Sequence, residues 1–407
     1  MPTDRLLQTL SAEVDEMRRA GTLKGDEHVT REVVPADGER GPRYRIEGRG
    51  DTPFLKMNSN GYLGLSLEPE LVAAEEEAAR RFGVGPGAVR FISGTHTPHV
   101  ELERRLAAFH GREAGMIFSS AYATTLGVLV PLITADTLVV SDELNHNCII
   151  NAMRLARPAG KAIYRHLDLE HLDELLGEAN GSHQRAIVVT DGIFSMRGDH
   201  APLDEIAEIV RAHDARFPQN AILVVDDSHG VGAFGATGRG TEEVTGGTSD
   251  LLIATLGKAL GVNGGYVVGE RRILDYLREK APLYIYSNPI TAAEAAAALT
   301  AVDLLDSERG RERLRHLGEM TRRFESGLVE LGFETIPGAH PVVPLMVRDT
   351  ERTAALVDHL ERGGVLATGL AFPVVPRGDE EIRFQVNASH TEADIDEVLS
   401  LLAAFDG

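Results

Sequence analysis

Cysteine is the scarcest reactive residue of this 407-residue chain, with Cys148 as its one representative. A lone cysteine cannot close an internal disulfide, and it cannot supply a zinc cluster built from cysteines. We expect the Cys148 side chain to be a small, partly buried group. The fold must therefore be stabilised by a hydrophobic core, for which the hydrophobic content of 43% is ordinary.

Positive charge is also in short supply, because 41 Lys and Arg residues stand against 62 Asp and Glu residues. The resulting net charge of −21 repels phosphates at long range. It argues against a protein that binds nucleic acid or a membrane surface. An anionic ligand must instead be held by local groups, such as backbone N–H groups and a few cations.

Long hydrophobic runs are absent too, since no segment approaches the roughly 18 consecutive apolar residues of a membrane span. Residues 1–20 have the pattern of a charged amphipathic helix and lack the apolar centre of a signal peptide. Internal repeats and low-complexity segments are missing as well. These absences predict a cytoplasmic protein without a membrane partner.

What the chain does have is the periodicity of an α/β protein. Residues 26–56 suit a small sheet, and a helix is expected over 69–82. Short apolar strands then alternate with helical patterns, which is typical of strands buried on both faces of a mostly parallel sheet. The expected strands are 114–118, 137–140, 186–190, 221–226, 251–255 and 266–269. Ligands of such sheets bind beyond the carboxyl ends of the strands.

The last part of the chain has a different pattern. Helices are expected over 291–305 and 311–331, before two short strands (342–347, 381–386) and two further helices (353–362, 392–405). We therefore expect three parts along the chain. They are an N-terminal arm with a small sheet (1–56), a large domain with the mostly parallel sheet (57–290) and a smaller C-terminal α+β domain (291–407).

Charged side chains stand at the ends of successive expected strands. Lys258 follows the strand 251–255, in a segment with glycines on both sides. Asp226 ends the strand 221–226, and Asp191 follows the strand 186–190. A lysine must be neutral to attack an aldehyde, and burial favours the neutral form. A buried aspartate needs a cation. A Schiff-base lysine and an aspartate for the pyridinium nitrogen are what a pyridoxal phosphate site requires.

Two other interpretations of these residues stay open. Asp226 and Lys258 could form a structural ion pair at the strand ends. Alternatively Asp226, Asp227 and His229 could bind a metal ion, since carboxylates and imidazoles are common ligands. No further cluster with ligand spacing accompanies them, so we expect no metal.

Neighbouring residues could complete a cofactor site. His229 could reach the same ring as Asp226, His146 could stack on its face, and the Thr255 hydroxyl could turn toward the phosphate. Residues 119–123 precede a helical pattern, and the N–H groups at a helix N-terminus bind anions without net positive charge. Each feature alone also has an ordinary structural explanation, such as a helix N-cap or a loop histidine.

Taken together, the motifs resemble those of the α-oxoamine synthases. These are pyridoxal phosphate enzymes of fold type I that include 2-amino-3-ketobutyrate CoA ligase, 8-amino-7-oxononanoate synthase, 5-aminolevulinate synthase and serine palmitoyltransferase. The matching segments run in the right order from about residue 55 to residue 395. They are 60–65, 83–90, 92–95, 145–146, 190–196, 226–232, 235–240, 255–261 and 372–391.

The resemblance implies a role for each residue around the cofactor ring. Lys258 would hold the cofactor and later move the Cα proton of the substrate. Asp226 would pair with the pyridine nitrogen, His229 would bond the ring hydroxyl, and His146 would stack on the ring face.

The resemblance also implies how the phosphate is held. Thr255 and the backbone amides of Ala121 and Tyr122 would bind it, joined by Ser287 of the partner subunit. A homodimer with its active site at the subunit interface would then be the functional unit.

The substrate end follows from the same resemblance. Arg383 and Asn60 would clamp the carboxylate of the amino acid, because a guanidinium suits a bidentate carboxylate. Ser195 would contact either the cofactor hydroxyl or that carboxylate.

The implied activity is that of a C-acyltransferase. A small amino acid would condense with an acyl thioester, carried by CoA or by a carrier protein, to give an α-amino ketone, a thiol and usually carbon dioxide. The segments 372–376 and 389–391 look most like the ligase branch. The alternatives are a fold type I aminotransferase or amino acid lyase, and a non-catalytic protein that binds pyridoxal phosphate or a sugar nucleotide. The complete set of candidate site residues disfavours the last.

Three positions depart from the family pattern. Gly61 stands where Asn or Asp is usual, Arg197 replaces the usual Asp of Ser-Met-Asp-Gly-Asp, and His146-Asn147-Cys148 replaces His-Ala-Ser. The first two alter the charge near the expected substrate entrance. They bear on the choice of amino acid and thioester, whereas the cofactor assignment is unaffected.

Overall fold

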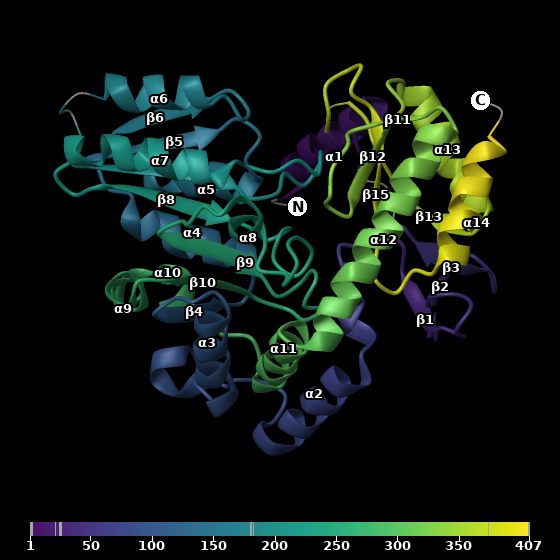
Figure 1. Cartoon of the computed structure of the whole chain (residues 1–407), viewed down its shortest axis with the longest axis horizontal. Coiled ribbons are helices and arrows are strands. Elements are labelled where there is room, and N and C mark those ends of the chain that lie inside the picture. Colours follow the sequence, from purple (N-terminus) through teal and green to yellow (C-terminus); the bar gives the residue numbers. More distant parts are fainter. Residues whose placement is uncertain are drawn as a thin grey trace.

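The structure is a computed structural model that describes residues 3–20, 22–23, 27–179, 181, 183–372 and 374–405. Pro373, within the matching segment 372–391, lies outside the described residues. The chain forms two lobes that stand side by side in Figure 1, with the larger sheet at the left and a smaller lobe at the right. The long helix α12 runs from the base of the molecule up along the smaller lobe.

A seven-stranded sheet forms the centre of the large lobe, in the order β4-β10-β9-β8-β7-β5-β6. The strand β10 pairs antiparallel with both of its neighbours, β4 and β9, whereas the remaining neighbouring strands of this sheet pair in parallel. Its strands are β4 (Ala114–Phe118), β5 (Thr137–Asp142), β6 (Gly160–Tyr164), β7 (Arg185–Asp191), β8 (Ala221–Asp226), β9 (Leu251–Thr255) and β10 (Gly265–Gly269).

Alternate residues of each central strand enter different parts of the core. In β7, Val188 belongs to one hydrophobic cluster, whereas Ile187 and Val189 belong to the other. In β8, Leu223 and Val224 divide in the same way. Both faces of the sheet are therefore buried, which explains why these strands are continuous apolar runs.

Helices cover the two faces of this sheet and connect its strands. Several begin at the side chain that the sequence offers as an N-cap: Ser120 accepts a bond from the amide of Ala123, and Thr291 and Glu294 form a capping box. The helices of the large lobe are α2 (Pro69–Phe82), α3 (Thr97–Phe109), α4 (Ala121–Leu132), α5 (Asn147–Ala156), α6 (Leu169–Glu178), α7 (Leu203–His213), α8 (Thr241–Thr245), α9 (Arg271–Lys280), α10 (Pro282–Ile285) and α11 (Ala292–Leu305), with short turns η1 (Leu65–Leu67), η2 (Arg90–Gly94) and η3 (Asp214–Arg216).

The small lobe combines the two ends of the chain. One four-stranded sheet has the order β11-β12-β15-β14, and a second has the order β1-β2-β3-β13, so β13 of the C-terminal part completes the N-terminal sheet. The strands are β1 (Thr30–Val34), β2 (Arg43–Ile46), β3 (Pro53–Lys56), β11 (Glu334–Thr335), β12 (Val342–Met346), β13 (Val365–Leu366), β14 (Thr368–Leu370) and β15 (Glu381–Gln385). The helices are α12 (Glu308–Glu330), α13 (Thr350–Arg362) and α14 (Glu392–Ala403). The N-terminal helix α1 (Asp4–Arg19) has no buried residues.

The architecture confirms the predicted α/β fold class, a mostly parallel sheet with a smaller α+β part. The predicted helix over 69–82 has the bounds of α2, and most predicted strands agree within one or two residues. The strand β6 was not predicted, because its residues alternate between intermediate, exposed and buried positions at the edge of the sheet. The division into three parts stays a prediction.

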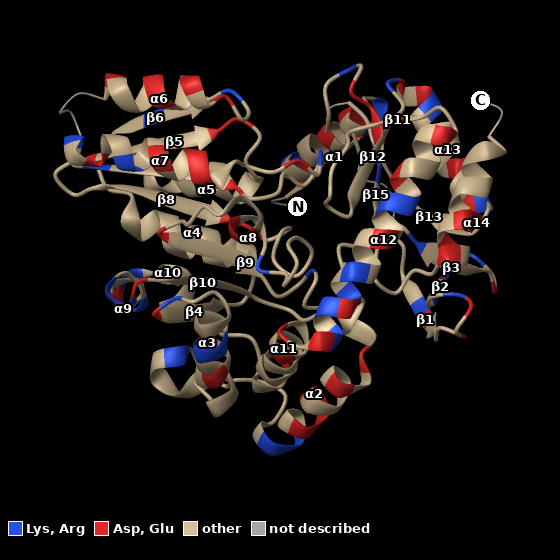
Figure 2. Cartoon of the chain, viewed as in Figure 1, with Lys and Arg blue, Asp and Glu red and all other residues tan. Residues whose placement is uncertain are grey.

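Charged side chains lie mainly on the outer helices, whereas the central strands are nearly free of them (Figure 2). The acidic and basic colours mix on most of these helices. In the described part of the chain, none of the helices has both the length and the apolar character needed to cross a membrane.

Candidate active site

Neighbouring strands of the large sheet end in a row of aspartates. Asp226 at the end of β8 lies in register beside Asp191 at the end of β7, and Asp142 ends β5. All three are buried. A cavity opens just beyond β7 and β8, and its lining residues are Ala121, Tyr122, His146, Cys148, Asp191, Ile193, Ser195, Asp226, Ser228, His229 and Lys258.

Asp226 accepts hydrogen bonds from several directions. Its Oδ1 accepts from the amide (3.2 Å) and hydroxyl (2.6 Å) of Ser228, and its Oδ2 accepts from the hydroxyl of Thr125 (3.0 Å). The Cys148 thiol lies 3.7 Å from Oδ2. Hydrogen bonds to a carboxylate stabilise its charged form. Among the described residues no ion pair joins Asp226 to Lys258, so the alternative of a structural ion pair finds no support.

Lys258 extends from the turn that follows β9. The amide of Gly261 donates to the Lys258 carbonyl (3.0 Å), and Gly261 has a φ of +71°, a conformation that favours glycine. Burial lowers the pKa of the Lys258 ammonium, although Asp226 and Asp191 oppose this shift. The lysine therefore loses its proton more easily than a lysine in water, as a nucleophilic amine or a proton acceptor requires.

His229 lies at the start of a chain of polar contacts. Its Nδ1 is 2.7 Å from the Tyr62 hydroxyl, which is 3.3 Å from Asn60 Oδ1. Burial, together with the charge of Lys258, holds the pKa of His229 well below its usual value, so the imidazole is neutral. One arrangement gives every acceptor a donor: His229 Nδ1–H donates to Tyr62, and the Tyr62 hydroxyl donates to Asn60. The Nε2 atom of His229 is then free to accept a bond in the cavity.

His146 caps the N-terminus of α5 from the opposite wall. Its Nδ1 accepts a bond from the amide of Cys148 (3.2 Å), and its own amide donates to Asp191 Oδ2 (3.1 Å). The Tyr122 ring stands edge-on to it, with centroids 6.4 Å apart. Burial lowers the pKa of His146, which favours a neutral ring. The ring lines the cavity, where it can stack on a flat ligand.

Two backbone amides at the beginning of α4 are available to bind a ligand. Ser120 caps the helix through the amide of Ala123, whereas the amides of Ala121 and Tyr122 donate to no group in the described part of the chain. Free N–H groups at the N-terminus of a 12-residue helix bind anions. Thr255, by contrast, uses its hydroxyl within the turn, donating to Gly264 (3.2 Å) and accepting from the amide of Gly257 (3.0 Å).

Arg383 approaches the cavity from β15 of the small lobe. Its guanidinium donates to the Ser195 carbonyl (3.0 Å) and to Asn60 Oδ1 (2.9 Å), and the Met196 sulfur lies 4.0 Å away. Burial lowers its pKa, but an arginine still stays charged at neutral pH. The predicted clamp residues Arg383 and Asn60 are therefore adjacent, next to the Ser195 that lines the cavity.

The structure thus brings most predicted site residues around one cavity: Lys258, Asp226, His229, His146, Ser195, Ala121 and Tyr122. Arg383 and Asn60 adjoin it through Ser195. Thr255 and Ser287 do not line it. Ser287 follows α10, next to Tyr286, and its hydroxyl makes a long 3.5 Å contact with the Asn288 carbonyl.

The predicted metal alternative required Asp226, Asp227 and His229 to converge. Asp227 instead accepts bonds from the amide (2.7 Å) and hydroxyl (2.8 Å) of Thr241. The three side chains are thus engaged by different partners. No group of three or more potential metal ligands occurs among the described residues.

Several contributors to the site were not predicted as functional. Tyr62 was noted as part of a motif, and Asp191 as a strand end, but neither received a role. Thr125 and Ser228 both donate to Asp226. Thr125 lies far from Asp226 in sequence, and Ser228 looks like an ordinary polar residue of a loop. His340, whose Nε2 is 2.9 Å from the His229 carbonyl, comes from the small lobe. A buried hydroxyl or imidazole carries no sequence signal until its partner is known.

Known proteins match almost the whole chain. A family model described as "Aminotransferase class I and II" matches residues 52–402. The chain is 37% identical over 395 residues to 8-amino-7-oxononanoate synthase 1 of Bacillus velezensis, an alignment that covers 97% of this chain and 96% of the relative. It is 38% identical over 391 residues to mitochondrial 2-amino-3-ketobutyrate coenzyme A ligase of Bos taurus, covering 95% and 89%. The chain belongs to the α-oxoamine synthase family.

The fold of this α-oxoamine synthase agrees with a solved structure. SPT with PLP bound as an internal aldimine is similar over 99% of this chain and 97% of its own, with a TM-score of 0.87 and 27% identity. The predicted family, fold type I architecture and enzyme class are thereby confirmed. The role of each site residue stays a prediction.

Proposed function

We propose that this α-oxoamine synthase condenses a small amino acid with an acyl thioester, releasing a thiol and usually carbon dioxide, with pyridoxal phosphate as cofactor. One observation carries the proposal: Lys258 and Asp226 line the same cavity, and Arg383 lies next to Ser195 at its substrate end. The relatives named above catalyse reactions of this type, and the SPT structure contains PLP.

The residues of the cavity suit this cofactor. The amides of Ala121 and Tyr122 would bind its phosphate, His146 would stack on its ring, and Asp226 would pair with its pyridine nitrogen. The Nε2 atom of His229 would accept a bond from the ring hydroxyl. Bound pyridoxal phosphate supplies an aldehyde for the amine and a cationic ring that accepts the electron pair from Cα.

The chain itself supplies binding and proton transfer. Arg383, with Asn60 behind it, would bind the amino acid carboxylate through charge-assisted hydrogen bonds. Lys258 would accept the Cα proton, since its lowered pKa leaves a larger neutral fraction near neutral pH. Asp226 would keep the adjacent ring nitrogen protonated, because its own carboxylate is stabilised by the bonds from Ser228 and Thr125.

A thiol-release assay tests this function. The purified protein, supplied with pyridoxal phosphate, is mixed with amino acids and acyl-CoA thioesters in pairs, and with carrier-protein thioesters in a second panel. We expect thiol release that needs both substrates, and a product that lacks the carboxyl carbon. Transamination without thiol release would overturn the proposal in favour of an aminotransferase. The Lys280→Ala variant, changed at an exposed lysine at the end of α9, is the control for Lys258→Ala.

We further propose that two copies form the active unit and that the enzyme acts in the cytoplasm. Large apolar side chains are exposed on the turn η2 and beside Ser287, where Phe91 (66%), Ile92 (64%) and Tyr286 (80%) face outward. Exposed apolar side chains grouped in this way are typical of a protein interface. Sedimentation should give twice the chain mass, and a monomer that retains full activity would overturn the dimer.

A further inference from the structure

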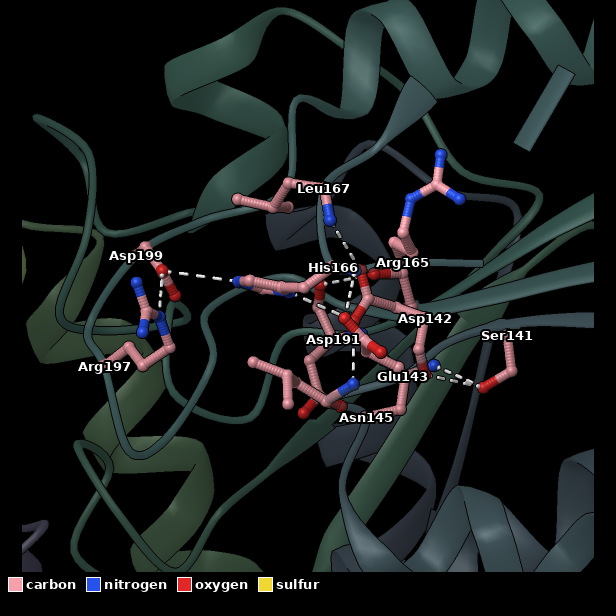
Figure 3. Close-up of polar contacts among 12 residues, drawn as sticks. Ser141, Asp142, Glu143, Asn145, Arg165, His166, Leu167, Asp191, Arg197 and Asp199 are labelled. Atoms are coloured by element: carbon pink, nitrogen blue, oxygen red, sulfur yellow. Dashed lines mark hydrogen bonds and ion pairs between the residues drawn. The ribbon is translucent and has the colours of Figure 1, made fainter. Parts of the chain in front are cut away.

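His166, just after β6, joins two loops of the candidate active site. Its Nδ1 is 3.0 Å from Asp142 Oδ1, and its Nε2 is 3.3 Å from Asp199 Oδ2. Figure 3 shows the imidazole lying between the two carboxylates. Phe194 stands edge-on to the ring, with centroids 4.4 Å apart. None of the site roles proposed above uses His166.

The Asp142 side of this bridge holds the turn that leads to His146. Asp142 Oδ1 also accepts from the amide of Leu144 (2.8 Å), and Oδ2 accepts from the amide of Leu167 (3.0 Å). Leu167 has a φ of +57°, a left-handed conformation that is strained for a non-glycine residue. That conformation aims its amide at Asp142, so the segment after β6 and the turn after β5 share one carboxylate.

The same turn continues into the wall of the cavity. The Asn145 amide group donates to Ser141 Oγ and to the Val189 carbonyl, both at 2.8 Å, and its oxygen accepts from the amide of Asp191 (2.8 Å). The next amide, of His146, donates to Asp191 Oδ2 (3.1 Å). The position of the His146 ring therefore depends on a turn that is tied at one end to Asp142 and at the other to Asp191 (Figure 3).

The Asp199 side holds the loop that carries Ser195. Asp199 Oδ2 also accepts from Arg197 Nε (2.7 Å), and the amide of Phe194 donates to the Asp199 carbonyl (3.0 Å). This closes a small loop around Ser195, whose carbonyl accepts from Arg383. Arg197 is one of the residues that depart from the family pattern, and here it contacts Asp199 of the bridge.

The bridge requires a charged imidazole. A carboxylate is an acceptor only, so both ring nitrogens of His166 must carry a proton to bond Asp142 and Asp199 together. Burial opposes this charge, but the bonds to the two carboxylates outweigh it and raise the pKa of His166 to about 9. The charged groups that face the ring are Asp142, Asp199, Arg197 through Asp199, and Glu143, whose Oε1 accepts from the His166 amide (2.8 Å).

We propose that His166 is a positioning residue whose imidazolium holds the His146 turn and the Ser195 loop at a fixed separation, and so sets the two walls between which cofactor and amino acid lie. The catalytic purpose of this bridge rests on the proposed function. The contacts that form the bridge belong to the protein alone, so the bridge can be tested without substrate.

Cys148 provides the test, because it is the chain's one cysteine and lies next to His146. The thiol is 2% exposed, and its Sγ is 2.9 Å from His146 Nδ1. Burial raises its pKa, with Asp226 adding to the shift, so the thiol reacts slowly while the turn is closed. The rate at which an aromatic disulfide reagent modifies Cys148 in the full-length protein as purified therefore measures how often this turn opens.

We expect His166→Ala to raise this rate about tenfold or more at pH 7, because the variant lacks the imidazolium that holds the turn in place. A tenfold change in rate corresponds to about 1.4 kcal/mol. Asp199→Asn, which keeps the side-chain shape, should raise it by about threefold or more. The matched control is His213→Ala, because His213 Nε2 forms a similar 2.7 Å contact with Asp173 between α7 and α6, away from the cavity. That control should leave the rate within about twofold of the wild type.

The pH profile separates the charged bridge from a merely structural role. As pH rises through about 9, the wild-type imidazolium loses its proton, so the ratio of the His166→Ala rate to the wild-type rate should fall toward 1 by pH 10. The ratio cancels the general increase of thiolate with pH. A ratio that stays constant, or a His213→Ala rate that rises as much as the His166→Ala rate, would overturn the proposal. Failure of the thiol-release assay would leave this result untouched.

Discussion

The two ends of the candidate active site are built differently. At the cofactor end, the bonds that Asp226 accepts from described side chains all come from the large lobe, from Ser228, Thr125 and Cys148. At the substrate end, Arg383 on β15 of the small lobe donates a hydrogen bond to Asn60. Under the proposed function, the difference teaches that one sheet would define where the chemistry occurs, whereas the contact between lobes would define which molecule is presented to it.

A chain of polar contacts connects the two ends. It runs from His229 through the Tyr62 hydroxyl and Asn60 to Arg383. Three hydrogen bonds thus link Arg383 to His229, whereas Asp226 and Lys258 are not part of this chain of contacts. The comparison between the two ends can be tested by changing one end and measuring the other.

The largest effect is expected for Lys258→Ala at the cofactor end. Removing the amine removes both covalent attachment of the cofactor and the proton acceptor, so thiol release should fall by about 10³-fold or more. Borohydride treatment followed by peptide mass spectrometry should find the cofactor mass on Lys258 in the wild type and nowhere in the variant. Full activity in Lys258→Ala would remove the cofactor end from the mechanism.

A smaller effect is expected for Arg383→Ala at the substrate end. Loss of charge-assisted hydrogen bonds of about 1.5–3 kcal/mol should raise the KM for the amino acid roughly 10- to 100-fold. The visible absorption of the bound cofactor should keep its wild-type maximum, because Asp226 and Lys258 are unchanged. Arg383→Lys keeps the charge but cannot form the bidentate fork, so its KM should lie between those of the wild type and Arg383→Ala. A lost cofactor spectrum would mean that the two ends are not separable.

The same difference explains how far the sequence could predict the site. Asp226 and Lys258 were predictable, because each follows a continuous apolar run whose end must lie at one edge of a parallel sheet. The α2 bounds were predictable from Pro69 at its first turn and Gly83 at its end. Such signals are local in sequence.

The remaining contributors depend on contacts between distant segments. Tyr62 and His340 meet His229 from different parts of the chain, and β13 joins the N-terminal sheet across more than 300 residues. Thr255 bonds within its own turn, to Gly264 and Gly257, and its role in phosphate binding stays a prediction. Hydroxyl orientation depends on competing partners, which strand and helix periodicity cannot rank.

The smallest effect concerns Glu381, two residues before Arg383 on the same strand. Glu381 is 3% exposed, and its Oε1 has no hydrogen-bond partner among the described residues. Burial raises its pKa to about 7, although Arg383 and Arg197 oppose the shift. The folded state therefore binds this proton more tightly than the unfolded chain. The stability it contributes is complete below about pH 4.5 and is lost as pH rises through 7.

Glu381→Gln removes this titration and should therefore become more stable than the wild type as pH rises. In urea unfolding between pH 5 and pH 8, the difference in unfolding free energy should grow in favour of the variant by on the order of 1–3 kcal/mol. The neighbouring Glu380→Gln is the control, because its own amide, the Gly378 amide and the Thr350 hydroxyl lower the pKa of Glu380 from 4.5. Glu380 is therefore ionised in both the folded and the unfolded state over this range, and the difference in unfolding free energy for Glu380→Gln should not depend on pH. If the Glu381→Gln difference were also independent of pH, the Glu381 carboxyl would be paired in the folded state and the expected titration would be absent.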